Sequence, residues 1–405
     1  MTTRQFSAHD SARRAVHKAP FDRRRRKTLL GLSFCAISLC ATLLPVFLEA
    51  GSQDAPDNPG FRPAVAGYSY RFPRDHGSHD EFRTEWWYYT GHLSVEDGRR
   101  FGYQLTFFRR GIEQARVRTN PSRWTIRHLY LAHFALSDHD NARFRYAEKV
   151  SRAGLGKAGA ETGQLRVWID RWIAETFSPH DDRHHLKASA KDFSIDFIVT
   201  PEKPPVVHGE RGVSRKGSAP GQASHYYSLT RLATTGILSV DGEQLKVRGT
   251  SWMDHEFGSG DLGEEQVGWD WFSVQLDNRS ELMFYRLRRT DGTSDAASSG
   301  TLTFPDGRSQ HLSASDLQVE NLDHWTSTAS GARYPSRWRI SAASLGLSLT
   351  LTPLFQDQEL ITRRSTQVTY WEGAVRVSGT LRNAPVSAQG YVELTGYAER
   401  LKQRL

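Results

Sequence analysis

The sequence predicts an all-β protein that consists of two tandem antiparallel β-barrels preceded by one N-terminal hydrophobic helix. After residue 72 the chain is a succession of short segments in which apolar and polar residues alternate, the period-2 pattern of half-buried strands. Turn signals such as Asp97-Gly98 and Asp241-Gly242 separate these segments. Similar blocks also recur in the same order in both halves of this region, which indicates an internal duplication.

The duplication rests on three matched blocks. FSIDFIVTP at 193–201 matches LGLSLTLTP at 345–353 in its alternation and in its closing Thr-Pro, and EWWYYTGHL similarly matches WDWFSVQL. The third block matches Tyr227, Gly236 and Gly249 with Tyr370, Gly379 and Gly390. We therefore expect a first domain at 73–257 and a second at 258–405, each of a size that can close into a small barrel and hold one ligand.

The positive charge of the chain is concentrated at its N-terminus. The net charge is +8, and residues 1–27 contain nine Lys or Arg against two Asp, which leaves a net charge of +1 for all later residues. A protein that binds nucleic acid through its folded body carries a basic face there. We therefore expect no nucleic-acid partner.

An uncharged apolar segment follows this basic head. Residues 28–48 contain no charged side chain and are long enough to cross a bilayer as one helix. The basic residues before them predict that 1–27 stay in the cytoplasm and that the body is exported. The segment is either cleaved as a signal peptide or retained as a single transmembrane anchor. Both alternatives place the body at the cell envelope, periplasmic or extracellular, behind a linker at 49–72 that is rich in Gly, Pro, Asp and Ser.

Several kinds of site are excluded by residue type and spacing. The two cysteines, Cys35 and Cys40, both lie in the hydrophobic segment, so the body has no disulfide, no thiolate metal site and no Cys nucleophile. His79, His184 and His255 each stand beside another possible metal ligand, but none of these groups has the spacing of a recognised zinc motif. The chain also lacks a Gly-x-Ser-x-Gly elbow and a Walker loop. We expect no metal and no cofactor.

The most informative stretch is GTSWMDHEFGSGDLGEEQVGWDW at 249–271, where strand patterns lead into and out of a Gly-rich turn. In an extended strand Asp254 and Glu256 point to one face and His255 to the other. Carboxyl groups in aromatic surroundings have raised pKa values, which a general acid needs near neutral pH. The candidate catalytic residues are therefore Asp254, His255, Glu256 and Asp270. The alternative is a buried ion-pair network with Arg286 or Arg288.

Aromatic residues beside acidic ones mark the candidate ligand-binding residues. The run EWWYYTG either fills the core of the first barrel or lines an apolar pocket with Glu85 at its mouth. Burial of aromatic rings is favourable in both places, so the pattern alone does not distinguish them. Glu372 and Glu393 occupy matching strand ends in the second copy. The full candidate set is Glu85, Trp86, Trp87, Tyr88, Trp252, Trp269, Trp271, Glu372, Glu393 and Tyr397.

Six blocks of the chain resemble a known family. HDEFRTEWWYYTGHL, GTSWMDHEFGSG, GWDWFSVQL, FYRLRR, YWEGAVRVSG and GYVELTGY are similar to signature blocks of the AttH-like and carotenoid 1,2-hydratase superfamily of bacterial envelope proteins, often described as secreted hydrolases. The match runs over 72–401 in family order. The resemblance implies two lipocalin-like barrels and a lipophilic ligand between or within them.

The resemblance implies two alternative functions. In the first, the protein is a hydratase, or a hydrolase-like enzyme, that protonates an isolated isoprenoid alkene from Asp254 or Asp270, with His255 or Glu256 orienting the water that adds. The indole rings that would stabilise the cation are those of Trp252, Trp269 and Trp271. In the second, the protein binds a lipid without catalysis and serves an ABC-type export permease, since such proteins are often encoded beside one.

Overall fold

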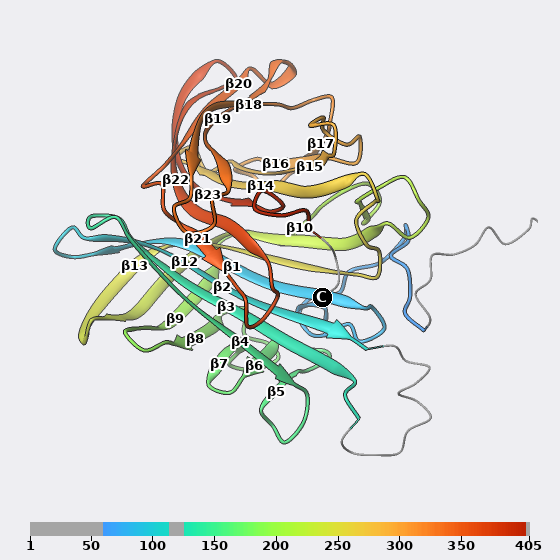
Figure 1. Ribbon diagram of the computed structural model, residues 1–405, viewed down its shortest axis with the longest axis vertical. Coiled ribbons are helices and arrows are strands. Elements are labelled where there is room, and N and C mark those ends of the chain that lie inside the picture. The colour runs from blue at the N-terminus through green and yellow to red at the C-terminus, as the bar shows by residue number, and fades with distance from the viewer. Residues whose placement is uncertain (1–59, 113–124, 402–405) are drawn as a thin grey trace, which may run out of the picture. The chain divides into compact units, whose positions relative to one another are not determined.

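The computed structural model describes residues 60–112 and 125–401, and nearly all their regular structure is β-strand (Figure 1). The exceptions in these ranges are two single 3-10 turns, η1 (Arg74–His76) and η2 (Ala343–Leu345). Within the same ranges, no helix has both the length and the apolar character needed to cross a membrane. The predicted all-β class is confirmed. The predicted basic head, the hydrophobic segment and the linker up to residue 59 lie outside the described residues.

The first sheet is antiparallel and contains 13 strands of the described chain. Its main path runs β4-β3-β2-β1-β13-β12-β9-β8-β7-β6-β5, and β10 and β11 pair with β12. The strands are β1 (Thr84–Val95), β2 (Arg100–Gly111), β3 (His128–Asp138), β4 (Arg143–Arg152), β5 (Ala158–Ala160), β6 (Arg166–Ile169), β7 (Trp172–Thr176), β8 (His184–Ser189), β9 (Phe193–Pro201), β10 (Val206–Val207), β11 (Ser214–Arg215), β12 (Ala223–Val240) and β13 (Glu243–Gly258).

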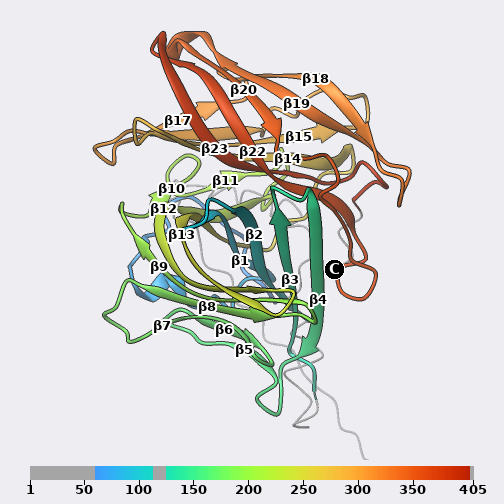
Figure 2. The same ribbon diagram turned by 90° about the vertical axis from the view of Figure 1, so that its left-hand side faces the viewer.

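The first sheet curls into a nearly closed barrel (Figure 2). Strands β3 and β4 come back into contact with β6. Lys149 of β4 donates a hydrogen bond of 2.9 Å to Asp170, which lies in the turn between β6 and β7. The interior is packed with buried side chains that include Trp87, Tyr89, Phe107, Phe134 and Phe197. The interior of this barrel is therefore filled by side chains.

The second sheet is also antiparallel and contains ten strands of the described chain, on the main path β17-β16-β15-β14-β23-β22-β20-β19-β18, with β21 pairing with β22. Its strands are β14 (Gln266–Leu276), β15 (Glu281–Arg289), β16 (Ser299–Thr303), β17 (Ser309–Ser313), β18 (Gln318–Thr326), β19 (Arg333–Ala342), β20 (Leu347–Pro353), β21 (Glu359–Ile361), β22 (Thr369–Leu381) and β23 (Ala384–Leu394).

The second sheet forms a half-barrel, so the prediction of a second closed barrel is wrong. Its two edges, β17 and β18, have no further strand partner in the described chain. In the first sheet the corresponding gap is bridged by β5 and β6, which the chain inserts between β4 and β7. In the second copy the chain passes from β17 to β18 through residues 314–317 alone, so the strands that would close the barrel are missing.

The strand order of the two sheets is otherwise the same, as expected for a duplicated unit. The central order β2-β1-β13-β12-β9 of the first sheet corresponds to β15-β14-β23-β22-β20 of the second. The matched glycines occupy equivalent strands. Gly236 of β12 corresponds to Gly379 of β22, and Gly249 of β13 corresponds to Gly390 of β23. A Cβ at any of these four positions would collide with a carbonyl oxygen of the neighbouring strand. Glycine is therefore required in both copies by the close approach of the backbones.

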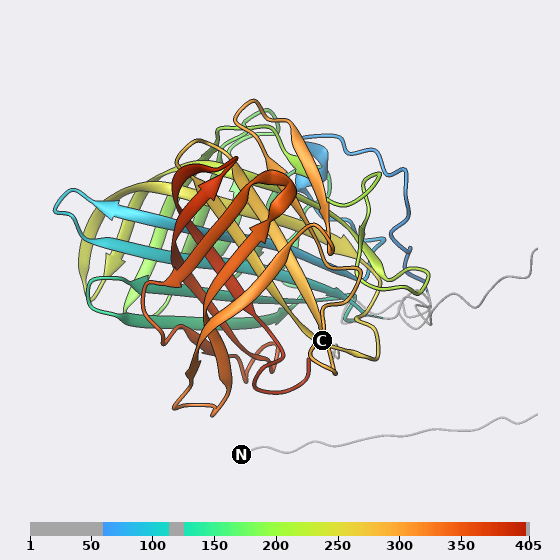
Figure 3. The ribbon, with the colours of Figure 1, turned by 90° about the horizontal axis from the view of Figure 1, so that it is seen from above.

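The outer faces of the two sheets pack against each other. Seen from above, the strands of the second sheet lie across those of the first (Figure 3). The buried residues of this layer include Tyr88, Tyr226 and Trp252 from the first sheet and Trp271 and Tyr391 from the second. Hydrogen bonds also cross the layer: His92 Nε2 lies 2.9 Å from Gly390 O, and Gln275 Nε2 donates to Ser251 O over 2.9 Å. The layer thus combines apolar packing with specific polar contacts.

Candidate active site

A cavity of about 160 Å³ lies in the layer between the two sheets. Its walls come from β1, β2, β12 and β13 on one side and from β14, β15, β22 and β23 on the other. Indole and phenol rings make up much of the lining, namely those of Trp86, Tyr88, Tyr226, Trp269, Trp271, Tyr285 and Tyr370. Four carboxyl groups also face it well inside the layer, those of Asp254, Glu256, Glu372 and Glu393.

Strand alternation decides which residues of the acidic stretch reach the cavity. Asp254 and Glu256 of β13 lie opposite Tyr88 and Trp86 of β1 and share the cavity face with them. His255, between them, points to the interior of the first barrel, where its ring stacks on Trp87 at 4.9 Å. The predicted division of these three residues between two faces is confirmed.

Asp254 is held by three donors in a buried pocket of aromatic rings. Trp252 Nε1 and the Tyr226 hydroxyl donate to it over 2.6 Å each, and the Ser228 hydroxyl also donates to it. Trp271 Nε1 in turn donates to the Tyr226 hydroxyl over 3.0 Å. Burial nevertheless raises the pKa of Asp254 from 3.8 to about 7, against the effect of these hydrogen bonds. Near neutral pH this carboxyl can therefore hold or release a proton.

Glu256 differs because it has a cation as a partner. Its Oε1 lies 3.0 Å from Lys216 Nζ and accepts a 2.6 Å hydrogen bond from Ser224. Burial opposes the charge on Lys216, but the carboxylate of Glu256 outweighs burial and raises the pKa of Lys216. The ammonium group also lies 4.0 Å from the centre of the Tyr285 ring. Glu256 and Lys216 therefore form an ion pair in the wall of the cavity.

Glu372 and Glu393 face the cavity from the second sheet. They are direct partners across β22 and β23, so their side chains are neighbours. Glu372 accepts a 2.5 Å hydrogen bond from Tyr88, and Glu393 accepts one of 2.8 Å from Trp269 Nε1. Burial and the charge of Glu393 raise the pKa of Glu372 well above its ordinary value, and burial raises the pKa of Glu393 to about 7. The pair cannot hold two negative charges at neutral pH.

Asp270 lies on the opposite face of β14 from Trp269 and Trp271 and does not line the cavity. Arg286 Nε and Arg288 Nε donate to its carboxylate over 3.0 and 2.8 Å. Tyr397, the other candidate of this group, donates a 3.0 Å hydrogen bond to the same carboxylate. Asp270 and Tyr397 thus belong to a buried ion-pair network inside the second sheet, the alternative left open by the sequence.

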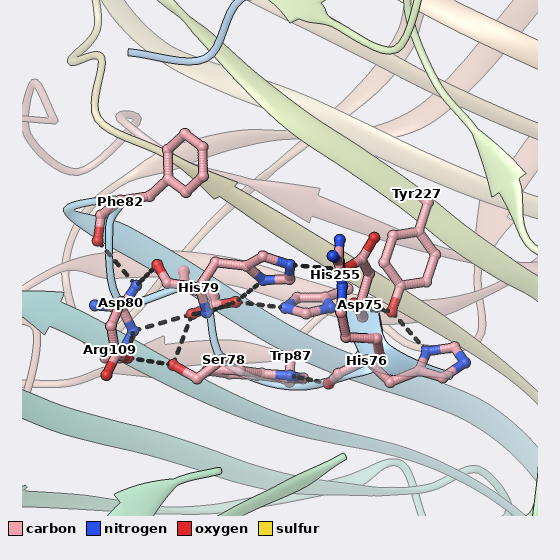
Figure 4. A network of polar contacts seen from close by, with 12 residues as sticks. Asp75, His76, Ser78, His79, Asp80, Phe82, Trp87, Arg109, Tyr227 and His255 are labelled. Atoms are coloured by element: carbon pink, nitrogen blue, oxygen red, sulfur yellow. Dashed lines mark hydrogen bonds and ion pairs between the residues drawn. The ribbon is translucent and has the colours of Figure 1, made fainter. Parts of the chain in front are cut away.

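Glu85 and His255 belong to a second buried network. Figure 4 shows His255 in this network together with His79 and Arg109. Glu85 Oε1 lies 2.8 Å from both His255 Nε2 and His79 Nδ1, and Glu85 Oε2 accepts from Arg109 Nε over 2.9 Å. Burial opposes the charge on Glu85, but Arg109 and the two imidazoles hold the pKa of Glu85 well below its ordinary value. Trp87 anchors the same segment by donating to His76 O over 3.0 Å. These residues stabilise the fold and do not reach the cavity.

The same network contains three possible metal ligands. The ligand atoms of His79, Glu85 and His255 lie within 4.8 Å of one another. Both imidazoles already hydrogen-bond to Glu85 Oε1, and the guanidinium group of Arg109 hydrogen-bonds to the other oxygen of the carboxylate. A cation here would meet that positive charge, so the contacts are explained by ion pairing alone.

Several residues of the site were not predicted from the sequence. Among those that line the cavity, Lys216 comes from the long insertion between β9 and β12, Tyr226 from β12 and Gln104 from β2. Ser228 of β12 donates a hydrogen bond to Asp254. The alternation of HYYSLTRL was the available signal for Tyr226 and Ser228, because it places both on one face of β12. A loop residue such as Lys216 gives no periodic signal.

Comparison with known proteins identifies the family. A family model described as AttH-like matches residues 63–397. A solved structure from Nitrosomonas europaea, assigned to AttH, is 36% identical with a TM-score of 0.74, and the match covers 83% of this chain and 100% of that one. Solved kievitone hydratase from Nectria haematococca is similar in fold, at 16% identity and a TM-score of 0.64, with 85% and 98% of the chains covered.

A curated kievitone hydratase, from Fusarium solani subsp. phaseoli, is 22% identical over 218 residues, which are 53% of this chain. The match spans 61% of the length of that relative. The six sequence blocks, the strand order and the family match over residues 63–397 agree: the chain belongs to the AttH-like family.

Proposed function

We propose that this protein is an enzyme that adds water to an isolated alkene of an apolar, isoprenoid-like substrate. The observation that carries the proposal is a set of three carboxyl groups, Asp254, Glu372 and Glu393, in a cavity lined by indole and phenol rings. None of the three has an ion-pair partner among the described residues. The raised pKa values of all three make a protonated carboxyl available near neutral pH. The kievitone hydratase relatives support the same class of reaction.

The chemistry follows from the positions of these groups. Asp254 donates a proton to the less substituted alkene carbon, and the π electrons form the new C–H bond, which leaves a tertiary cation on the other carbon. The faces of Trp269 and Trp271, which line the cavity, stabilise that cation by about 0.5 to 2 kcal/mol each. Trp252 does not line the cavity and acts through its hydrogen bond to Asp254. Water then adds to the cation.

The volume of the cavity limits the part of the substrate that enters it. A cavity of about 150 Å³ in another protein binds benzene, so about 160 Å³ accommodates one branched five-carbon unit. We infer that the end of an isoprenoid chain enters and the rest extends through the opening. In a lipocalin-like barrel the ligand would lie inside, but here the first barrel is filled and the ligand lies between the sheets.

Isotope labelling tests the proposed reaction. The protein is incubated in H₂¹⁸O with a dimethyloctene that carries one terminal trisubstituted alkene and no oxygen, and ¹⁸O in the alcohol product is measured by mass spectrometry. We expect Asp254→Asn to lower turnover about 100-fold or more, the usual contribution of a general acid. Glu243→Gln, which alters an exposed ion pair with Arg99, is the matched control. A folded Asp254→Asn protein with full turnover would contradict the assignment.

The competing proposal is a non-enzymatic lipid-binding role for an ABC-type permease. Native mass spectrometry separates the two, because a carrier retains its lipid during purification without detergent. A retained lipid together with no ¹⁸O product from the wild-type protein would favour the carrier and reject the hydratase.

A further inference from the structure

Three buried polar atoms of residues that line the cavity have no hydrogen-bond partner in the described chain. They are Trp86 Nε1, Glu372 Oε2 and Gln104 Oε1. Two of these atoms, Glu372 Oε2 and Gln104 Oε1, belong to residues that are only 2% exposed. Buried polar atoms are nearly always hydrogen-bonded, so each such exception needs an explanation. Because both atoms border a cavity, an occupant of the cavity can satisfy them.

The two atoms belong to one end of the cavity. Tyr88 connects the two side chains. Its hydroxyl donates to Glu372, and its neighbour across β1 and β2 is Thr106. Gln104 Nε2 donates to the hydroxyl of this Thr106 over 2.6 Å. Tyr370 precedes Glu372 by two residues on the cavity face of β22, and its hydroxyl interacts with the Gln104 side chain. The side chains that hold Asp254 are others, namely Ser228, Tyr226 and Trp252, although Asp254 is the direct neighbour of Tyr88 across β1 and β13.

The polar end offers one donor and one acceptor. Gln104 Oε1 is an amide oxygen and can only accept. Glu372 faces the carboxyl group of Glu393 across the strand pair. Burial and the charge of Glu393 raise the pKa of Glu372 well above its ordinary value, whereas the pKa of Glu393 rises to about 7, so Glu372 holds the proton of the pair and its free oxygen donates. The group that satisfies both atoms must accept one hydrogen bond and donate another. A water molecule or a hydroxyl group does this.

We infer that Glu372 and Gln104 bind the water molecule that adds to the substrate cation. The inference rests on the proposed hydration reaction and assigns both residues a positioning role. The bound water accepts from the Glu372 carboxyl group and donates to Gln104 Oε1, which leaves one lone pair free to form the C–O bond. The oxonium ion so formed loses its extra proton to the Glu393 carboxylate. Exchange with solvent then transfers one proton from Glu393 to the medium and returns one to Asp254.

Deuterium labelling separates this role from the acid step. In D₂O a cation that is not captured by water returns a proton to Asp254, so repeated cycles place deuterium in the recovered alkene. The probe is the same dimethyloctene, which has no hydroxyl group of its own. We expect Gln104→Leu and Glu372→Leu to lower the ratio of alcohol formation to deuterium incorporation about 10-fold or more, as expected when a reactant loses its position. Asp254→Asn lowers both rates together.

A conservative variant tests whether Glu372 acts as a neutral donor. The amide of Glu372→Gln still donates a hydrogen bond, so we expect its ratio to stay within about 3-fold of the wild-type value. A loss as large as that of Glu372→Leu would show that Glu372 acts as an ionised base and would overturn the inference. Unchanged ratios in both leucine variants would also overturn it, and would leave the hydratase proposal intact.

A crystal structure gives a readout that does not depend on activity. We expect an ordered water within hydrogen-bond distance of both Glu372 Oε2 and Gln104 Oε1, and its loss in Gln104→Leu. A wild-type crystal structure in which the two atoms bond directly to each other, or in which a ligand hydroxyl group replaces the water, would overturn the inference. If the wild-type protein yields neither alcohol nor deuterated alkene, the proposed function fails and the inference fails with it.

Discussion

Asp254 and Glu85 are both buried carboxyl groups with several hydrogen-bond donors, yet we expect their neutralisation to change stability in opposite directions. Glu85 contacts the guanidinium group of Arg109, whereas Asp254 has no cation partner in the described chain. Asp254→Asn should therefore stabilise the protein at pH 8, and Glu85→Gln should destabilise it. The comparison tests whether the carboxyl group in the cavity is kept for function at a cost in stability.

The magnitude for Asp254 follows from its raised pKa. Each pKa unit corresponds to about 1.4 kcal/mol, so ionising Asp254 in the folded state costs roughly 4 kcal/mol at pH 8, since its pKa rises from 3.8 to about 7. Because the pKa of Asp254 is higher in the folded state than in the unfolded state, the stability that protonated Asp254 contributes is fully present below pH 4 and is lost as the pH rises through 7. Asn removes the ionisation but leaves the Tyr226 hydroxyl without its acceptor, which costs about 1 to 3 kcal/mol. We expect net stabilisation of about 1 to 3 kcal/mol at pH 8 and destabilisation of similar size at pH 4.

Glu85 gives the opposite result for a physical reason. Glu85→Gln leaves Arg109 as a buried charge without its counter-ion, which costs about 3 to 5 kcal/mol. Urea unfolding of the full-length protein, followed by tryptophan fluorescence at pH 4, 6 and 8, measures both variants against the wild type. An Asp254→Asn protein that is less stable than the wild type at pH 8 by more than about 1 kcal/mol would refute the reasoning.

Three further substitutions separate catalytic from structural roles. Asp270→Asn leaves two buried guanidinium groups without a full charge partner and should cost about 3 to 5 kcal/mol in urea unfolding, with kcat of the folded protein unchanged. Lys216→Met removes the counter-ion of Glu256, so the pH–rate profile for hydration should shift to higher pH, and an unshifted profile would contradict the ion-pair assignment. Gly249→Ala places a Cβ against a neighbouring carbonyl oxygen and should lower the urea midpoint, whereas an unchanged midpoint would show that the strands can separate at that point.

The sequence allowed the face of each residue to be predicted where one strand could be considered alone. Asp254 and Glu256 share a face because alternation within β13 fixes their directions, whatever the rest of the fold. The same reasoning applied to WDWFSVQL would have placed Asp270 in the core, because it shares its face with Phe272 and Val274. That signal was present but was outweighed by the acidic and aromatic composition around Asp270.

Other features depend on contacts that no local pattern records. The half-barrel arises because the second copy lacks counterparts of β5 and β6, and in the sequence those short strands are hidden in a stretch that reads as a loop. Lys216 reaches the cavity from an insertion of the first copy, so neither alternation nor the repeat predicts it. The pairing of Glu372 with Tyr88 joins residues 284 positions apart and depends on how the two sheets pack.

The duplication also explains why the cavity lies between the sheets. The equivalent strands β1 and β14 turn the same face toward each other, so Trp86 meets Trp269 at 6.0 Å and Tyr88 meets Trp271 at 5.2 Å between ring centres. A junction of two identical copies would present the same groups from both sides. Divergence of the copies places Asp254 on one wall and the Glu372 pair on the other. The proposed addition of water needs a proton and a water oxygen delivered from separate positions, and these two unlike walls supply a different set of carboxyl groups for each task.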